Sequence, residues 1–183
     1  DEIERAVDLL VRQPACAQFI SRELATYFVA DDPPPKLVEK MAHTFQRSDG
    51  DIAQVLRTMF ESDEFTASLG GKFKDPMHYV VSSVRLAYDG KTITNMHPVV
   101  TWLNNQGEAL FGHSTPDGYA LTENAWASSG QMSRRFEIAR IIGNGNAGLF
   151  DAADGTKSVD TGFPQLSSRL YYDGIQPYLS KTT

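Results

Sequence analysis

Apolar residues recur every three or four positions through the first two-thirds of the chain, and this spacing restricts the possible folds more than any other sequence feature. Ile3, Val7 and Leu10 form the first such stripe, and comparable stripes follow along the chain. Residues spaced in this way share one face of an α-helix. No alternation typical of a β-strand persists beyond a few residues. The sequence therefore predicts a mainly α fold.

Proline, glycine and aspartate interrupt the helical spacing at short intervals. Asp75 followed by Pro76 is typical of a helix start, because aspartate caps free backbone amides and proline fits the first helical turn. The segments between such breaks predict a multi-helix bundle of about seven helices. The main breaks are ADDPPP (30–35), RSDGD (47–51), LGGKFKDP (69–76) and GNGNAG (143–148).

A chain of 183 residues is long enough to bury one hydrophobic core, so we expect residues 1–183 to form a single helical domain with its core in residues 1–149. Residues 150–163 are rich in Gly, Asp, Ser and Thr, which predicts a long irregular segment near the C-terminus. Residues 164–183 are expected to form a C-terminal helical segment. The chain starts in helical rhythm without an initiator methionine, which favours the C-terminal part of a larger protein.

Composition argues against several classes of function. The net charge is −6, and the closest basic cluster is the pair Arg134 and Arg135, so no positive field attracts nucleic acid. No apolar run approaches the roughly 18 residues of a membrane-spanning helix. Cys16 is the single cysteine, so an intramolecular disulfide is impossible. We therefore predict neither nucleic-acid binding nor a membrane span.

The GNGNAG stretch matches the spacing of a dinucleotide-binding loop, but that loop requires a buried strand before it and a helix after it. The preceding residues 134–142 have the pattern of a helix end, so Gly143 and Gly145 are better interpreted as left-handed residues that close this helix. The four histidines lack the spacing of zinc ligands, and the acidic loops lack oxygen ligands at the positions that an EF-hand requires. We predict no cofactor and no metal.

The stretch FGHSTPDGY places a histidine, a serine and an aspartate within five positions. Adjacent residues in an extended loop point apart, so His113 is poorly placed to accept the proton of Ser114. Pro116, Asp117 and Gly118 instead have the chemistry of a tight turn. We interpret the stretch as a structured loop and assign no catalytic residue.

A ligand site beside this loop is a further hypothesis. The aromatic residues at 119 and 126 each combine an apolar ring with a polar tip, which suits fastening the loop to a helical core. Helical spacing resumes at about residue 122, so residue 126 and two later arginines should share the adjacent helix. A plainer interpretation is that an ion pair between Asp117 and one arginine fixes the loop to the helix, because such pairs are commoner than binding sites. The ligand-binding candidates are His113, Asp117, Tyr119, Trp126, Arg134 and Arg135.

Three blocks of the sequence resemble a known family. They begin at RELATYFVADDPPP, at KFKDPMHYVV and at GEALFGHSTPDGYAL. Within residues 14–142 they follow the order found in the C-terminal half of the bacterial "domain of unknown function 1800" family. The family loop has the Pro-Asp-Gly-Tyr core that stands here at 116–119, whereas His113 and Ser114 occupy a variable pair.

The resemblance implies a parent protein with an N-terminal half that this chain lacks. It also implies an export signal, and hence a periplasmic or extracellular location, although the residues themselves leave a cytoplasmic location open. The partners that the resemblance implies are the missing N-terminal half and a protein of the "domain of unknown function 1501" family, which is often encoded nearby.

Together these features favour an uncharacterised helical module of an exported bacterial protein, with an accessory or interaction role. This hypothesis predicts a large exposed apolar patch where the partner half docks. One alternative is part of a hydrolase-like enzyme for envelope or polymer substrates, with His97, His113, Asp117 and an arginine around a cleft that the missing half completes. Another is a glycan or small-ligand binding module that uses Tyr171 and Tyr172 beside the loop aromatics.

Overall fold

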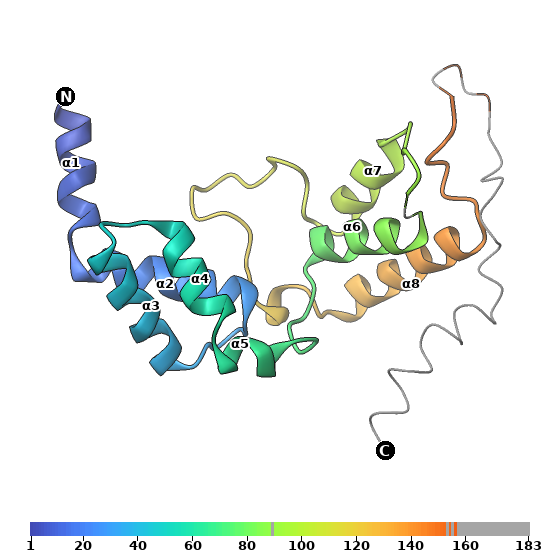
Figure 1. The fold of residues 1–183 in the computed structure, drawn as a ribbon. Coiled ribbons are helices and arrows are strands. Elements are labelled where there is room, and N and C mark those ends of the chain that lie inside the picture. The colour runs from blue at the N-terminus through green and yellow to red at the C-terminus, as the bar shows by residue number, and fades with distance from the viewer. Residues whose placement is uncertain (89, 153, 155, 157–183) are drawn as a thin grey trace. The chain divides into compact units, whose positions relative to one another are not determined.

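The computed structural model describes residues 1–88, 90–152, 154 and 156 (Figure 1). These residues are mainly helical, as the apolar spacing predicted, and they contain no β-strand. The predicted C-terminal helical segment and part of the predicted loop at 150–163 lie outside the described residues. The helices are α1 (Glu2–Val11), α2 (Pro14–Phe28), α3 (Pro35–Arg47), α4 (Ile52–Phe60), α5 (Asp63–Ser68), α6 (Pro76–Ala87), α7 (His97–Asn105), the 3-10 helix η1 (Glu123–Ala125) and α8 (Ser129–Gly143).

The chain divides into two compact units. Unit 1 comprises Asp1–Phe73 and Leu121–Glu123, and unit 2 comprises Lys74–Ala120 and Asn124–Thr183. Each unit contains its own cluster of buried apolar side chains. The prediction that residues 1–183 form one domain stays a prediction.

The core of unit 1 is formed by α2, α3 and α4. Three small residues of α2, Ala17, Ser21 and Ala25, are fully buried, and small side chains of this kind let two helices approach closely. Met41 of α3 and Met59 of α4 are also fully buried, and their unbranched side chains fill irregular gaps in a core. The sequence of α2 therefore favours a closely packed helical core.

Side-chain caps set the starts of the next two helices of unit 1. Asp51 accepts a hydrogen bond from the Ala53 amide at 2.9 Å and so begins α4. The hydroxyl of Ser62 accepts one from the Phe65 amide at 3.1 Å and begins α5. The sequence did not predict α5, because six residues are too few to display a helical period.

The core of unit 2 is formed by α6, α7 and α8. Val80 of α6, Leu103 of α7 and Ile138 of α8 are buried in one cluster. The segment after α8 adds Leu149, which is fully buried, and its carbonyl accepts a hydrogen bond of 2.9 Å from the Asn95 amide. This bond ties the residues before α7 to those after α8.

The start of α6 agrees with the prediction. Asp75 accepts a hydrogen bond of 2.7 Å from the His78 amide, and Pro76 is the first residue of the helix. Aspartate is stabilising here because it satisfies a free amide and faces the positive end of the helix dipole.

The start of α8 differs from the prediction of a helical segment from about residue 122 onward. The η1 turn comes first, and α8 begins only after Ser128, whose hydroxyl accepts a hydrogen bond from the Gln131 amide at 3.3 Å. Trp126 therefore lies in the connection before α8, and the prediction that it shares a helix with the two arginines is wrong. The serine cap determines this start, because it supplies an acceptor for a free amide.

The end of α8 confirms half of the glycine prediction. Gly143 is the last residue of the helix, and of the two glycines only Gly145 has a left-handed backbone, with φ of +68°. A helix thus precedes GNGNAG, where a dinucleotide-binding loop would need a strand.

Candidate functional site

The loop between α7 and η1 contains the predicted tight turn. The Gly118 amide donates to the Thr115 carbonyl at 3.4 Å, and Gly118 has a φ of +73°. The Asp117 carboxylate accepts a short hydrogen bond from the Thr115 hydroxyl. This bond, together with the Asp117 backbone amide and His113, lowers the pKa of Asp117. The turn is therefore held by its own side chains.

His113 lies against the same turn. Its Nδ1 is 3.1 Å from the Thr115 carbonyl oxygen and 3.8 Å from Asp117 Oδ1. Its ring meets the Tyr119 ring edge to face, with centroids 4.8 Å apart. The imidazole contacts the turn and the aromatic ring, so the geometry of the loop gives it a packing role.

Tyr119 and Trp126 fasten this loop through their polar tips. The Tyr119 hydroxyl donates to the Ala109 carbonyl at 2.9 Å, and Trp126 Nε1 donates to the Ala120 carbonyl at 2.8 Å. The two rings are tilted, with centroids 6.1 Å apart, and Trp126 is only 7% exposed. Four predicted site residues, His113, Asp117, Tyr119 and Trp126, are thus brought together in one loop, in which Trp126 is buried and His113 and Asp117 are exposed.

The two candidate arginines leave α8 in different directions. Arg134 Nη1 lies 3.4 Å from Glu137 Oε2 on the same helix. Arg135 is 5% exposed, with its guanidinium 4.9 Å from the centre of the Tyr79 ring. The carboxylate of Asp117 contacts Thr115 and His113. The predicted ion pair between Asp117 and an arginine is therefore wrong, because Asp117 is satisfied within its own loop.

A buried polar cluster surrounds Arg135. Glu108 is 9% exposed and accepts a hydrogen bond of 2.7 Å from the Met77 amide, in the first turn of α6. Burial raises the pKa of Glu108, while the Met77 amide acts in the opposite direction. The Tyr79 hydroxyl donates to the Arg135 carbonyl at 2.6 Å. The sequence analysis missed this cluster, because Glu108 lies 31 positions from Met77 and no local motif connects them.

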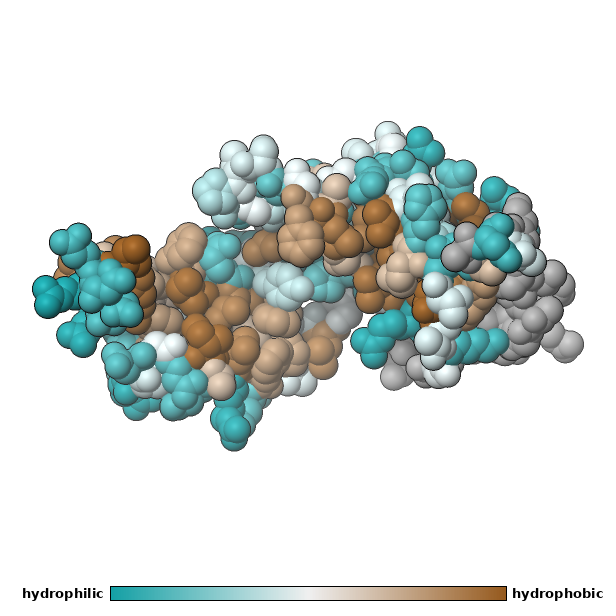
Figure 2. All heavy atoms as spheres, turned by 90° about the horizontal axis from the view of Figure 1, so that it is seen from above, coloured by the Kyte–Doolittle hydropathy of each residue, from teal (hydrophilic) through white to brown (hydrophobic). Residues whose placement is uncertain are grey.

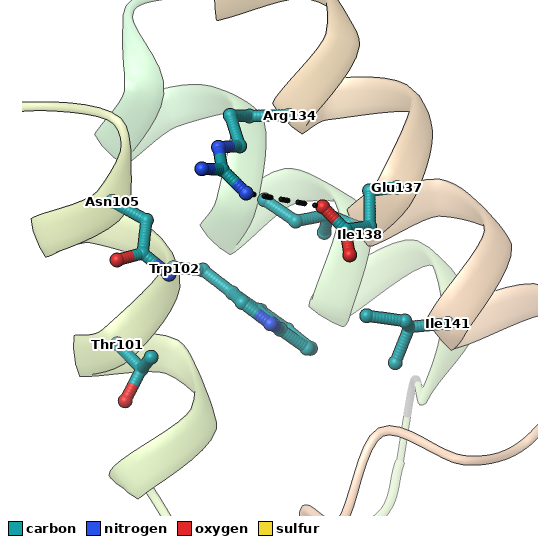
Figure 3. A pocket seen from close by; sticks show the side chains of 7 residues that line it. All are labelled: Thr101, Trp102, Asn105, Arg134, Glu137, Ile138 and Ile141. Carbon is teal, nitrogen blue, oxygen red and sulfur yellow. Dashed lines mark hydrogen bonds and ion pairs between the residues drawn. The ribbon is translucent and has the colours of Figure 1, made fainter.

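A cleft between α7 and α8 forms the second candidate site in unit 2. Its volume is about 130 Å³. The α7 side is lined by Thr101, Trp102 and Asn105. From the α8 side, Arg134 extends toward the gap beside Glu137, and the Trp102 ring lies between the two helices (Figure 3). The cleft also includes Ile138 and Ile141. Of the predicted site residues, only Arg134 lines it.

Unit 1 has an exposed apolar surface on α1. Ile3, Val7 and Leu10 are 72%, 52% and 62% exposed, and no residue of this helix is buried. These three residues, here called the α1 apolar face, lie on one side of the helix because they are spaced by four and three positions. Figure 2 shows brown side chains along one side of α1, with hydrophilic residues on the other.

No group of three or more His, Cys, Asp or Glu side chains is arranged to hold a metal ion within the described part of the chain. Over the same residues, none of the helices has the length and apolar character that crossing a membrane requires.

The described residues form a helical module of two units, which includes a fastened loop, a small cleft and the α1 apolar face. The chain belongs to the family described as "Protein of unknown function (DUF1800)", whose model matches residues 1–182. The family resemblance inferred from the three sequence blocks is thereby confirmed. No curated protein and no solved structure matches the chain.

Proposed function

We propose that this chain is an interaction module of an exported bacterial protein, and that the α1 apolar face is its docking surface. The observation that carries the proposal is the exposure of Ile3, Val7 and Leu10 on a helix without a buried residue. Exposed apolar side chains gathered on one surface are typical of an interface.

The length of α1 supports a need for a partner. The helix has 10 residues, and isolated helices shorter than about 12 residues are marginal in water. Asp1 caps its first turn with a hydrogen bond of 3.2 Å to the Ile3 amide, and such a cap contributes about 1 kcal/mol. Burial of the apolar face would add the larger stabilisation, because fully burying one Leu or Val side chain contributes roughly 2 kcal/mol.

The occupant that we propose is the N-terminal half of the parent protein. The support is the resemblance of the three sequence blocks to the C-terminal half of longer family members. Glu4 and Asp8 lie on another side of α1 and suit contact with water, so docking would leave that side exposed. A protein of the "domain of unknown function 1501" family is the second partner in this proposal.

The test compares hydrogen exchange in the full-length parent protein and in the chain of residues 1–183. The amides of α1 should exchange markedly more slowly in the parent. The double variant Val7→Asp, Leu10→Asp should remove that protection, whereas the matched variant Glu4→Ala, Asp8→Ala on the polar side should retain it.

Two outcomes would overturn the proposal. One is equal exchange of the α1 amides in parent and isolated chain. The other is a dimer of the isolated chain, measured by light scattering, that dissociates in the Val7→Asp, Leu10→Asp variant, because the occupant would then be a second copy.

The hydrolase-like alternative has less support. His97 begins α7, where its amide donates to Asn95 Oδ1 at 3.1 Å. His113 and Asp117 contact one another within the exposed turn described above. No observation favours a shared cleft for these three residues.

A further inference from the structure

The cleft between α7 and α8 is lined by polar groups with unused hydrogen-bonding capacity. In the described part of the chain, the side chains of Thr101, Trp102 and Asn105 make no hydrogen bond. Arg134 contacts Glu137 at 3.4 Å through one of its nitrogens, and a guanidinium carries five N–H donors. The lining therefore offers both donors and acceptors to a molecule in the cleft.

The floor of the cleft is rigid and aromatic. Trp102 and Ile138 are 7% and 4% exposed and belong to the core cluster of unit 2. Figure 3 shows the indole between the two helices, with the side chains of Asn105 and Arg134 extending into the space above it. An indole attracts the positive edges of C–H bonds, so the small part of Trp102 that lines the cleft suits contact with one edge of an aliphatic ring.

The charges in the cleft favour a neutral occupant. Arg134 and Glu137 contribute one positive and one negative group, which lie 3.4 Å apart and are about half exposed. A phosphate would meet the Glu137 carboxylate, and an amine would meet the Arg134 guanidinium. A purely apolar molecule would separate these groups from water without replacing their hydrogen bonds.

Hydroxyl groups match this mixed lining best. Each hydroxyl is both donor and acceptor, so neighbouring hydroxyls can pair with a guanidinium, a carboxylate and a carboxamide at once. The cleft has a volume of about 130 Å³, less than the 150 Å³ cavity that holds a benzene ring, and Asn105, Arg134 and Glu137 at its mouth are exposed. A hexose would therefore enter with one edge and keep the remainder in water.

We propose that the cleft between α7 and α8 binds a neutral hexose ring, either as a free sugar or as the terminal residue of a glycan. Trp102 forms the floor, Asn105 and Arg134 bind the ring hydroxyls, and Glu137 orients Arg134. The site lies within unit 2 and is separate from the α1 apolar face.

Nuclear magnetic resonance of the 15N-labelled chain tests this site directly. The chain has two tryptophans, and Trp126 Nε1 is already bonded to the Ala120 carbonyl, so its signal serves as an internal reference. Titration with N-acetylglucosamine, glucose and methyl β-glucoside should move the Trp102 indole signal to saturation. We expect a dissociation constant on the order of 1 mM for a small open site of this kind.

Variants and comparison ligands distinguish binding in the cleft from nonspecific binding elsewhere on the chain. Asn105→Ala and Arg134→Met should each weaken binding about tenfold, whereas Arg140→Met, an exposed position on the same helix, should bind like wild type. Binding of the methyl glycoside as strongly as glucose would assign the cleft to a glycan terminus, and loss of that binding would assign it to free sugar.

Three results would overturn the proposal. The first is no saturable movement of the Trp102 signal with any of the three sugars. The second is equal weakening in Arg134→Met and Arg140→Met. The third is saturation by valine or inorganic phosphate without saturation by sugars, because the cleft would then select a charged ligand.

Discussion

The Glu108 carboxylate accepts a hydrogen bond of 2.7 Å from the Met77 amide. Burial of Glu108 raises its pKa above the ordinary value of 4.5. The neutral, protonated Glu108 carboxyl group is therefore favoured more in the folded chain than in the unfolded chain. The resulting stabilisation is fully present below about pH 4.5, and it is lost as the pH rises through the raised pKa.

Glu108→Gln should accordingly gain stability relative to wild type as the pH rises. The amide keeps an acceptor for Met77 but cannot ionise. Urea unfolding between pH 4 and pH 8, in steps of about one unit, should show a difference in unfolding free energy that widens upward from about pH 4.5. A constant difference across this range would show that Glu108 ionises normally.

Asp31 should behave in the opposite way. Burial acts to raise its pKa, but hydrogen bonds from Lys72 and from the Glu123 amide outweigh burial and lower it. Its stabilisation is present above its ordinary pKa of 3.8 and is lost as the pH falls through the lowered value. Urea unfolding of Asp31→Asn between about pH 6 and about pH 2 should show a deficit in unfolding free energy relative to wild type that shrinks below the ordinary pKa of 3.8.

Lys72 should stabilise unit 1 through two contacts. It forms an ion pair with Asp31 and donates to the Leu121 carbonyl at 2.7 Å. Lys72→Met should therefore cost about 1–2 kcal/mol in the free energy of unfolding, and the Glu123 amide should exchange faster. The control is Arg22→Met, because the Arg22–Asp32 pair at 3.4 Å is exposed and such pairs contribute about 0–1 kcal/mol. Equal losses in both variants would contradict this prediction.

Two buried serines in unit 1 should respond to alanine with opposite signs. The Ser21 hydroxyl is fully buried and has no partner in the described structure, so Ser21→Ala should stabilise the chain by about 1 kcal/mol. Ser62 donates to the Met59 carbonyl at 2.6 Å and caps α5, so Ser62→Ala should cost about 1 kcal/mol. Thermal and urea unfolding measure both changes. A loss of stability in Ser21→Ala would mean that its hydroxyl is satisfied.

Alanine substitutions at two glycines should distinguish the effect of backbone conformation on stability from the effect of steric crowding. A Cβ would meet no atom within 4 Å at Gly118 or at Gly130. Gly118 has a φ of +73°, so Gly118→Ala should cost about 1 kcal/mol. Gly130 lies in the first turn of α8, so Gly130→Ala should stabilise by roughly 0.5 kcal/mol. If both variants changed the unfolding free energy relative to wild type in the same direction, the assigned turn would be contradicted.

The helical architecture was predictable because it depends on local patterns. Apolar spacing located most helices, and aspartate followed by proline located the start of α6. The start of α8 was missed because Ser128 caps it after an intervening turn. The place of Leu121–Glu123 in unit 1 has no local sequence signal, since these residues group with a distant part of the sequence.

The contacts of the loop aromatics were more predictable than the directions in which the two arginines point. The polar tips of Tyr119 and Trp126 predicted side chains that fasten a loop, and both bond to nearby carbonyls. Arg134 and Arg135 are neighbours in sequence, but successive helical residues point about 100° apart. One therefore enters the core of unit 2 and the other reaches the cleft. The sequence alone does not determine which side of α8 faces the core, because that depends on the elements that pack against the helix.

Because unit 1 takes Leu121–Glu123 from beyond the first part of unit 2, no single proteolytic cut releases it intact. A fragment ending at Phe73 would retain both partners of the Asp31–Lys72 pair but lose the Leu121 carbonyl and the Glu123 amide. A synthetic peptide covering residues 119–125, added to such a fragment, is the natural means of restoring the missing contacts. Recombinant work on this half of the molecule should therefore begin from complementation instead of truncation.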